Sequence, residues 1–167
     1  MLDTFRFVIR NLLPTDIEAA LLLNNANVPA VNELDLAELT RLISIAEVAL
    51  TAEIDGAFAG FCIVLAPGAD YASLNYRWFS QHYSDFVYLD RIAVDSNARR
   101  YGLGRAFYAE LVTRFTGTFP QLFCEVNIRP RNDASLDFHH SLGFREIGQQ
   151  DTDGGTKTVS LLSLQLP

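Results

Sequence analysis

One stretch of the chain, from Asp90 to Leu111, constrains the fold more than any other. It opens as an apolar run that ends at Val94, continues as a short polar turn and reaches a glycine-rich segment. After that segment, apolar side chains recur at the spacing of one helical face: Leu103, Phe107, Leu111 and Phe115. The pattern predicts a strand that passes through a turn into an amphipathic helix.

The start of that helix is suited to bind an anion. The first N–H groups of a helix have no partner within it, and the helix dipole adds positive charge there. Gly102 and Gly104 have no Cβ atom, so a phosphate can approach the backbone closely. The side chains of Arg99, Arg100 and Arg105 add further positive charge. These residues together predict a binding site for a pyrophosphate.

Two common nucleotide motifs do not fit this segment. A Mg-nucleotide loop needs Lys and then Ser or Thr at its second glycine, and neither follows Gly104. The missing lysine therefore argues against Mg-dependent ATP binding. A dinucleotide fingerprint needs a small residue where this chain has Phe107. The pattern that is left is R-x-x-G-x-G, formed by Arg99, Gly102 and Gly104 after the strand.

This strand, motif and helix resemble the acetyl-coenzyme A motif of the GNAT N-acetyltransferase superfamily. A second block, NDASLDFHHSLGF, is similar to a later motif of that superfamily, N-x-x-[AS]-x-x-[FL]-Y-x-x-x-G-F. The residues in register are Asn132, Ser135, Phe138, Gly143 and Phe144. The chain departs from the motif at His139, which stands where the family usually has tyrosine. The resemblance covers nearly the whole chain, in the family's order.

The resemblance implies an acyltransferase that uses acetyl-CoA as co-substrate and no metal. A primary amine attacks the thioester directly. The backbone of residues 92–94 is expected to pair with the pantetheine arm, and the N–H groups of residues 100–105 are expected to hold the pyrophosphate. The expected cofactor-binding residues are Ile92, Ala93, Val94, Arg99, Arg100, Tyr101, Gly102, Leu103, Gly104, Arg105, Asn132, Ser135 and His139.

Three residues are candidates for proton transfer. The imidazolium of His139 can protonate the departing thiolate, or the residue only contacts the cofactor or packs. Glu125 lies in an otherwise apolar strand and resembles the base of some N-terminal-amine acetylases in this superfamily. Its alternative is a structural carboxylate, paired with Arg91 or with the backbone. Asp90 is the rival base, and a salt bridge to a nearby arginine is its alternative.

The acceptor site is expected near an aromatic cluster around an irregular segment, Pro67 to His82. The cluster consists of Tyr71, Tyr76, Trp78, Phe79, Tyr83, Phe86 and Tyr88. These rings either cover one edge of the sheet or form the wall of an enclosed pocket, where an ammonium gains cation–π attraction. An enclosed pocket favours a small-molecule amine over a peptide N-terminus. The expected substrate-binding residues are Trp78, Tyr83, Tyr88 and Asp90.

Other functions stay open alongside this one. The chain can transfer another acyl group, such as propionyl or succinyl, or transfer acetyl to a peptide N-terminus. From a different class, it can be a non-catalytic module that binds and senses acyl-CoA. The C-terminal strand commonly pairs across dimers in the superfamily, so a homodimer is among the assemblies that the resemblance allows.

Composition bounds the remaining partners. A net charge of −7 argues against nucleic acid or an anionic membrane as the main partner. The longest apolar run, residues 57–66, is too short to span a bilayer. Asp3, Arg6 and Arg10 interrupt any apolar leader, so the cytoplasm is the default compartment. Cys62 and Cys124 lie in apolar runs and are expected to be reduced and buried.

The 167 residues predict a single domain, residues 1–167, of the α/β (α+β) class. The expected architecture is three-layered, with a twisted, mostly antiparallel mixed sheet flanked by helices. Strands are expected over about residues 5–10, 48–54, 57–66, 86–94, 120–127, 144–150 and 156–166. Helices are expected over about residues 15–25, 35–46, 103–117 and 133–141. Asp55 and Gly56 are expected to form a hairpin turn.

Overall fold

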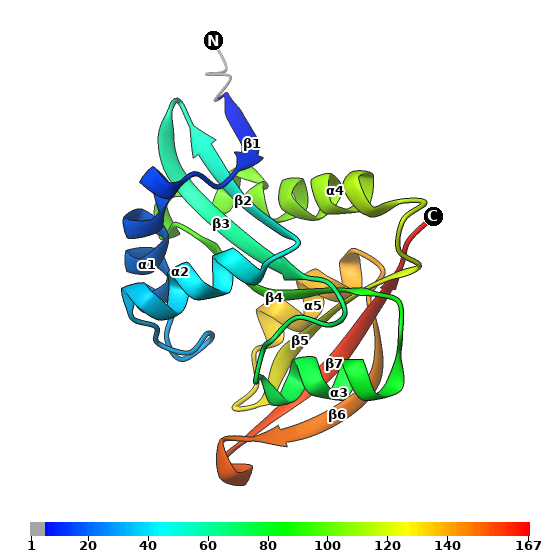
Figure 1. Cartoon of the computed structure of the whole chain (residues 1–167). Coiled ribbons are helices and arrows are strands. Elements are labelled where there is room, and N and C mark those ends of the chain that lie inside the picture. The colour runs from blue at the N-terminus through cyan, green and yellow to red at the C-terminus, as the bar shows by residue number, and fades with distance from the viewer. Residues whose placement is uncertain (1–5) are drawn as a thin grey trace. The chain divides into compact units, whose positions relative to one another are not determined.

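A computed structural model gives the structure of residues 6–167 as two compact units (Figure 1). Unit 1 comprises residues 6–65 and Asp90–Arg114, and unit 2 comprises Ala66–Leu89 and Phe115–Pro167. Phe5, the expected first residue of the first strand, lies outside the described residues, as does Asp3. The strands follow the order β1-β2-β3-β4-β5-β7-β6 in one seven-stranded sheet. The fold class is confirmed: the sheet is mixed, mostly antiparallel and flanked by helices.

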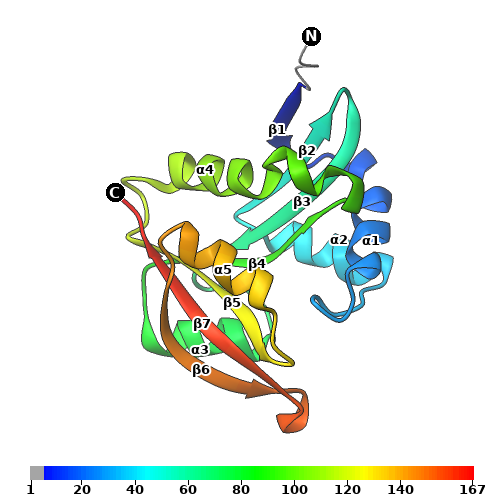
Figure 2. The same ribbon diagram turned by 180° about the vertical axis from the view of Figure 1, so that it is seen from behind.

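Unit 1 carries a β-meander with helices on both faces, in which β1, β2 and β3 are antiparallel. Its strands are β1 (Phe7–Asn11), β2 (Val48–Ile54), β3 (Ala57–Leu65) and the second part of β4 (Val87–Val94). The helices α1 (Ile17–Ala26) and α2 (Leu36–Ile45) lie on one face, and α4 (Leu103–Phe115) lies on the other (Figures 1 and 2). Two short 3-10 helices, η1 (Pro14–Asp16) and η2 (Ser96–Tyr101), precede α1 and α4.

Local signals explain these elements. The side chain of Asp35 accepts a hydrogen bond from the N–H of Glu38 and caps α2, and Leu39 and Leu42 form its buried face. Asp55 and Gly56 both have positive φ, which matches the expected hairpin turn between β2 and β3. The helix, strand and turn signals in this part of the chain therefore predicted the elements within one or two residues.

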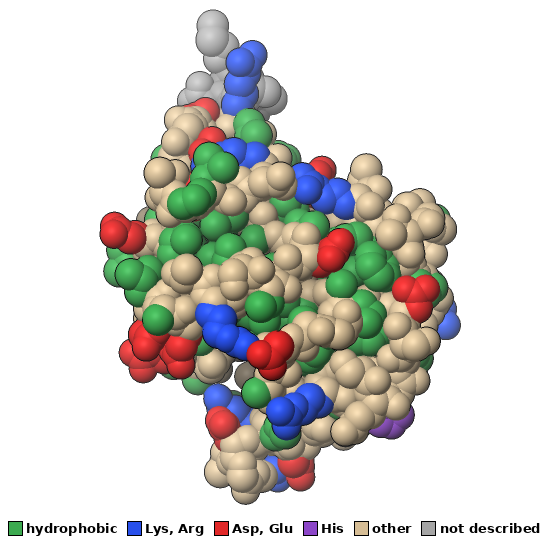
Figure 3. All heavy atoms as spheres, viewed as in Figure 1, with side chains coloured by type: hydrophobic (Ala, Val, Ile, Leu, Met, Phe, Trp, Pro, Cys, Tyr) green, Lys and Arg blue, Asp and Glu red, His purple; other side chains and the backbone are tan. Residues whose placement is uncertain are grey.

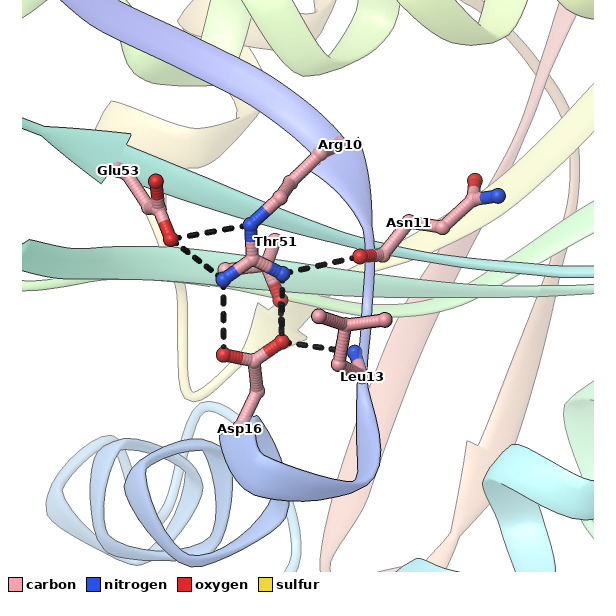
Figure 4. A network of polar contacts seen from close by, with 6 residues as sticks. All are labelled: Arg10, Asn11, Leu13, Asp16, Thr51 and Glu53. Carbon is pink, nitrogen blue, oxygen red and sulfur yellow. Dashed lines mark hydrogen bonds and ion pairs between the residues drawn. The ribbon is translucent and has the colours of Figure 1, made fainter. Parts of the chain in front are cut away.

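A polar network ties β1 to the start of α1 (Figure 4). The Arg10 guanidinium donates to both carboxylate oxygens of Asp16, at 2.7 and 2.9 Å, and its Nε donates to Glu53 at 3.0 Å. The Asp16 carboxylate also accepts from the Leu13 N–H at 2.7 Å. The hydrogen bonds from Arg10 are the largest cause that lowers the pKa of Asp16. One buried carboxylate thus joins the first strand, the turn after it and the first helix.

Strand β4 is divided between the two units. Val87 and Tyr88 pair in parallel with Leu122 and Phe123 of β5 (Gln121–Arg129), within unit 2. The later residues of β4 run beside β3 in unit 1, where a Cβ atom on Gly60 would lie only 2.8 Å from the Ala93 carbonyl oxygen. Glycine at this position therefore allows the two strands to approach closely.

Unit 2 is built on the strand order β5-β7-β6. The strands β6 (Arg145–Thr152) and β7 (Lys157–Gln165) pair in antiparallel fashion, as do β5 and β7. The helices α3 (Leu74–His82) and α5 (Asp133–Ser141) lie on opposite faces of these strands (Figures 1 and 2). A short 3-10 helix, η3 (Asp153–Gly155), connects β6 to β7. Strand β5 ends at Arg129, two residues later than the sequence predicts.

The expectation of an irregular segment over residues 67–82 was wrong, because its second half is the helix α3. The Ser73 side chain caps this helix by accepting from the Tyr76 N–H at 3.3 Å. Tyr76 and Phe79 lie three residues apart, on the buried face of the helix. Aromatic residues have only moderate helix propensity, and the burial that they gain from the sheet decides the conformation.

Most of the aromatic cluster is core rather than a lid. Phe79 stacks on Phe123 with ring centroids 4.5 Å apart, and Tyr76 and Phe79 lie 5.6 and 5.5 Å from the Tyr88 ring. Tyr76, Phe79, Phe86 and Tyr88 are each at most 3% exposed. These four rings therefore cover the sheet. This is the first of the two roles that the sequence left open, the other being the wall of an acceptor pocket.

Basic side chains are dispersed over one face of the molecule. On the face drawn in Figure 3, the Lys and Arg side chains of the described residues are scattered and form no single patch. Among residues 6–167, each helix lacks the length or the apolar character needed to cross a membrane.

Candidate functional site

The glycine-rich segment of unit 1 forms an open helix start. Gly102 has φ +75°, and a Cβ atom built on it would meet nothing within 4 Å. Helix α4 begins at Leu103, whose side chain is only 1% exposed, and the Ala106 N–H makes a helical bond to the Gly102 carbonyl at 3.0 Å. The preceding N–H groups, those of residues 103–105, are first-turn donors that point out of the helix. This geometry fits the pyrophosphate site that the sequence predicts.

The arginines of this segment are all exposed. Arg99 donates to the Asn27 side chain just after α1 at 3.3 Å, whereas Arg100 and Arg105 lie in η2 and in the first turn of α4. Tyr101 is 37% exposed. Gly104 is half-buried in the first turn of α4. Exposed guanidinium groups beside a helix N-terminus are suited to bind phosphate oxygens.

The last residues of β4 present backbone groups in two directions. The Ala93 carbonyl faces β3, and the Asp95 N–H donates to the Ala59 carbonyl at 2.8 Å. Backbone groups alternate along a strand, so those of Ile92 and Val94 point away from β3. This is the edge that the sequence analysis assigns to the pantetheine arm.

Asp90 is part of a buried network in unit 1. Its carboxylate accepts from Arg91 Nε at 2.7 Å, and both side chains are under 5% exposed. Arg91 also donates to the side chain of Asn24 at 2.8 Å and to that of Asn32 at 3.0 Å. The salt bridge that the sequence left as the alternative role of Asp90 is therefore present. The network joins β4 to the end of α1 and to the segment before α2.

Glu125 lies in unit 2 on the same face of β5 as Phe123, the face covered by α3. The Tyr88 hydroxyl lies 2.8 Å from each of its two carboxylate oxygens. Glu125 is half-buried, whereas Tyr88 is fully buried. The pair joins a candidate base to a residue that the sequence placed in the acceptor site.

Three predicted cofactor residues lie at the start and on the inner face of α5. Asn132 caps the helix by accepting from the Ser135 N–H at 3.2 Å. His139 is 5% exposed, and its Nδ1 lies 2.7 Å from the Ser135 carbonyl oxygen. Because a carbonyl only accepts, Nδ1 carries the proton in this contact, and Nε2 is the acceptor nitrogen of the neutral ring. Burial is the largest cause that lowers the pKa of His139.

Trp78 and Tyr83 are half-buried members of the aromatic cluster, as is Tyr71. Trp78 stacks on His82 with centroids 4.0 Å apart, and a Cβ atom on Gly148 would lie 2.9 Å from its ring. The Tyr83 ring lies 4.7 Å from that of Phe123. Both side chains therefore pack against the sheet and keep one part exposed.

The candidate residues fall into two sets. Unit 1 brings together Asp90, residues 92–94 and residues 99–105. Unit 2 holds Trp78, Tyr83, Tyr88, Glu125, Asn132, Ser135 and His139. Among residues 6–167, the His, Cys, Asp and Glu side chains form no group of three or more that could hold a metal ion.

Sequence reasoning missed the asparagines that bind Arg91. The available signals were a lone arginine inside an apolar strand and the run Asn24-Asn25-Ala26-Asn27 at the end of a helix. Asn24 is fully buried, and its amide donates to the Asn32 carbonyl at 3.0 Å. Each signal indicates a polar contact, but neither shows which residue the side chain contacts.

Comparison with solved structures shows the fold. The ribosomal-protein-S18-alanine N-acetyltransferase of Escherichia coli is 22% identical, with a TM-score of 0.73 over 96% of this chain and 94% of that chain. The ribosomal-protein-alanine N-acetyltransferase of Brucella melitensis is 24% identical, with a TM-score of 0.73 over 95% and 99%. A candidate phosphinothricin N-acetyltransferase is 17% identical, with a TM-score of 0.73 over 97% and 99%.

Comparison of sequences identifies the family to which the chain belongs. No curated protein sequence matches the chain. A family model described as the acetyltransferase (GNAT) family matches residues 22–144, which include the glycine-rich segment and the whole of the second motif. This match covers most of the chain, and members of the family use acetyl-CoA as the acetyl donor. The chain therefore belongs to the GNAT family of acetyltransferases.

Proposed function

We propose that the protein transfers the acetyl group of acetyl-CoA to the primary amine of a small molecule by direct attack. The observation that carries this proposal is the open start of α4, where first-turn N–H groups and exposed arginines fit a pyrophosphate. Bound acetyl-CoA supplies an activated thioester carbonyl and a thiolate leaving group. The chain's own residues bind it, orient the amine and move two protons.

Cofactor binding is assigned to the residues of both motifs. The N–H groups of residues 100–105, with Arg99, Arg100 and Arg105, hold the pyrophosphate. The outward backbone groups of Ile92 and Val94 bind the pantetheine arm as an added strand. In unit 2, the resemblance of the second motif assigns Asn132, the cap residue of α5, and Ser135 and His139 of that helix to the cofactor.

Glu125 is the better candidate for the base. The amine must lose a proton before it attacks, and a carboxylate or a water bound to it can take that proton. The carboxylate of Asp90 neutralises a buried guanidinium, so protonating it would leave Arg91 without its counter-ion. Glu125 is instead half-buried and bonded to a neutral hydroxyl.

His139 is assigned to the leaving group. Its Nε2 is the atom that can carry a proton to the thiolate, because Nδ1 is engaged by the Ser135 carbonyl. The lowered pKa makes the imidazolium a stronger acid and also a rarer form at neutral pH. A thiol has an ordinary pKa of about 8.5, so proton transfer to its thiolate is downhill.

The acceptor is assigned to the small amines. In unit 2, the half-buried Tyr83 ring lies beside Phe123, on the face of β5 that carries Glu125. A carboxylate near an aromatic ring is a combination that attracts an ammonium group. One structural relative is named for a small acceptor, phosphinothricin, and two are named for ribosomal-protein alanine. A peptide N-terminus is the second candidate for that reason.

A thiol-release assay with a panel of amines tests the proposal. The panel contains the amino acids, polyamines and aromatic amines, together with short peptides, and each is tried with acetyl-, propionyl- and succinyl-CoA. We expect amine-dependent thiol release from acetyl-CoA with a small amine at a KM of millimolar or below. Activity with peptides alone would overturn the small acceptor, and CoA binding without any turnover would favour a sensing module.

A further inference from the structure

The Tyr88 hydroxyl and the Glu125 carboxylate form a symmetric contact. The hydroxyl oxygen lies 2.8 Å from Oε1 and 2.8 Å from Oε2. The residues are 37 positions apart, and they come from the adjacent parallel strands β4 and β5. An ionised carboxylate can only accept, so the tyrosine is the donor and its single proton is shared between the two oxygens.

The position of this hydroxyl is fixed by packing. Tyr88 is 0% exposed, and its ring contacts those of Tyr76 and Phe79 on α3, with centroids 5.6 and 5.5 Å away. Tyr88 is also paired in register with Phe123, on which Phe79 stacks. A ring held in this way has one rotamer, so the O–H group is a rigid anchor for the side chain that it binds.

A rigid donor on the carboxylate has two physical effects. It restricts the rotation of the Glu125 side chain. Less conformational entropy is therefore lost when the carboxylate binds a substrate. It also stabilises the charged form over the protonated form.

We propose that Tyr88 is a positioning residue that sets the orientation and the basicity of Glu125. This inference rests on the proposed function, in which Glu125 takes a proton from the acceptor. The ammonium gives one proton to the carboxylate and becomes a neutral amine. The amine nitrogen then bonds to the thioester carbon, the carbon–sulfur bond breaks, and the thiolate leaves with the electron pair. The imidazolium of His139 gives its proton to the thiolate, and the second proton that the nitrogen loses as the amide forms replaces it, so the products are an amide and a free thiol. Glu125 returns its proton to water.

The test compares Y88F with a matched control, Y76F. Both variants remove one hydroxyl from the same buried cluster and keep the ring, but the Tyr76 hydroxyl bonds to the backbone at Ala66 and Ala69 instead of to a carboxylate. The probe is the panel amine with the highest turnover, and the readout is kcat against pH. The wild-type rate is expected to rise with pH through the ionisation of the base.

Removal of the donor should make the carboxylate harder to ionise. We expect Y88F to move this rise to higher pH by roughly half a unit or more and to lower the plateau several-fold. Y76F should leave the rise in place, and E125Q should abolish it. If Y88F fails to fold, 3-fluorotyrosine at position 88, a stronger donor, should move the rise to lower pH.

The possible outcomes distinguish failure of the proposed function from failure of the positioning role of Tyr88. Wild-type protein that releases no thiol with any amine overturns the proposed function and this inference with it. A wild-type rate that depends on Glu125 but keeps the same pH dependence in Y88F overturns only the positioning role. A shift of equal size in Y76F does the same, because it would show a general effect of loosening the cluster.

Discussion

The carboxylates of this protein differ in the groups to which they are hydrogen-bonded. Asp16 and Asp90 each accept from an arginine, at 2.7 Å, and both are largely buried. Glu125 is half-buried and accepts from a tyrosine hydroxyl. Removal of charge from Asp90 leaves the buried guanidinium of Arg91 without its counter-ion, whereas protonation of Glu125 leaves a neutral pair. This contrast separates structural acids from a candidate base.

Asp16 should make stability depend on pH. Its pKa is lowered in the folded state, so its contribution is present above the ordinary pKa of about 3.9 and is lost as the pH falls through the lowered value. We expect D16N to lower the free energy of unfolding at pH 7 by about 1–3 kcal/mol and to flatten the loss of stability in acid. Urea unfolding at pH 7 and pH 3 measures both effects.

The exposed Asp137 offers a control for this variant. D137N removes the same charge without a buried partner and should change neither the stability at pH 7 nor its dependence on pH. A D16N protein as stable as D137N at pH 7 would show that the network around Arg10 does not stabilise the fold.

His139 should affect chemistry more than binding. If Nε2 protonates the thiolate, H139F lowers kcat by on the order of 10²-fold and leaves the affinity for CoA nearly unchanged. H139Y should restore part of the rate, because tyrosine is the residue that the family motif expects. The neighbouring His140 is exposed, so H140F is the control. Wild-type kcat in H139F would leave His139 only a packing or binding role.

At the scale of elements, the start of α4 carries the assignment of the cofactor. We expect G104V to weaken CoA binding strongly, because a side chain there would occupy the space that phosphate oxygens need. The control is A109V, which places the same β-branched side chain on the exposed side of the same helix. Calorimetric titration with CoA compares the two, and equal affinities would place the pyrophosphate elsewhere.

Elements were predictable wherever the signal was local. The bounds of β2 and α5 match the sequence prediction, because alternation and a cap residue fix them within a few positions. The helix α3 was missed because its stability comes from Phe79 stacking on Phe123, a residue of a distant strand. Tertiary burial overrides weak helix propensity in such a segment.

The candidate site was predictable as a set of residues but not as a set of contacts. The motifs marked His139, Glu125 and the glycines by type and spacing. The asparagine partners of Arg91 lie 67 and 59 residues away, and Tyr88 lies 37 residues from Glu125. Contacts over such separations depend on topology and register, which local patterns do not encode.

At the scale of the whole molecule, family and acceptor rest on different kinds of observation. The match over residues 22–144 assigns the family, and relatives of 17–24% identity share the fold. A shared fold hosts many acceptors, so the acceptor has to be argued from Glu125 and the rings beside it. The single domain over residues 1–167, the homodimer and the cytoplasmic location stay predictions.

The central claim is acetyl transfer to the nitrogen of a small amine, and the most direct measurement is mass spectrometry of the products. The protein is incubated with acetyl-CoA whose acetyl group carries a heavy isotope, together with the amine panel. The account predicts one or a few small amines that gain the labelled acetyl group on nitrogen, with an equal amount of thiol released. Labelled acetyl on peptides alone, or on none of the compounds, would contradict it.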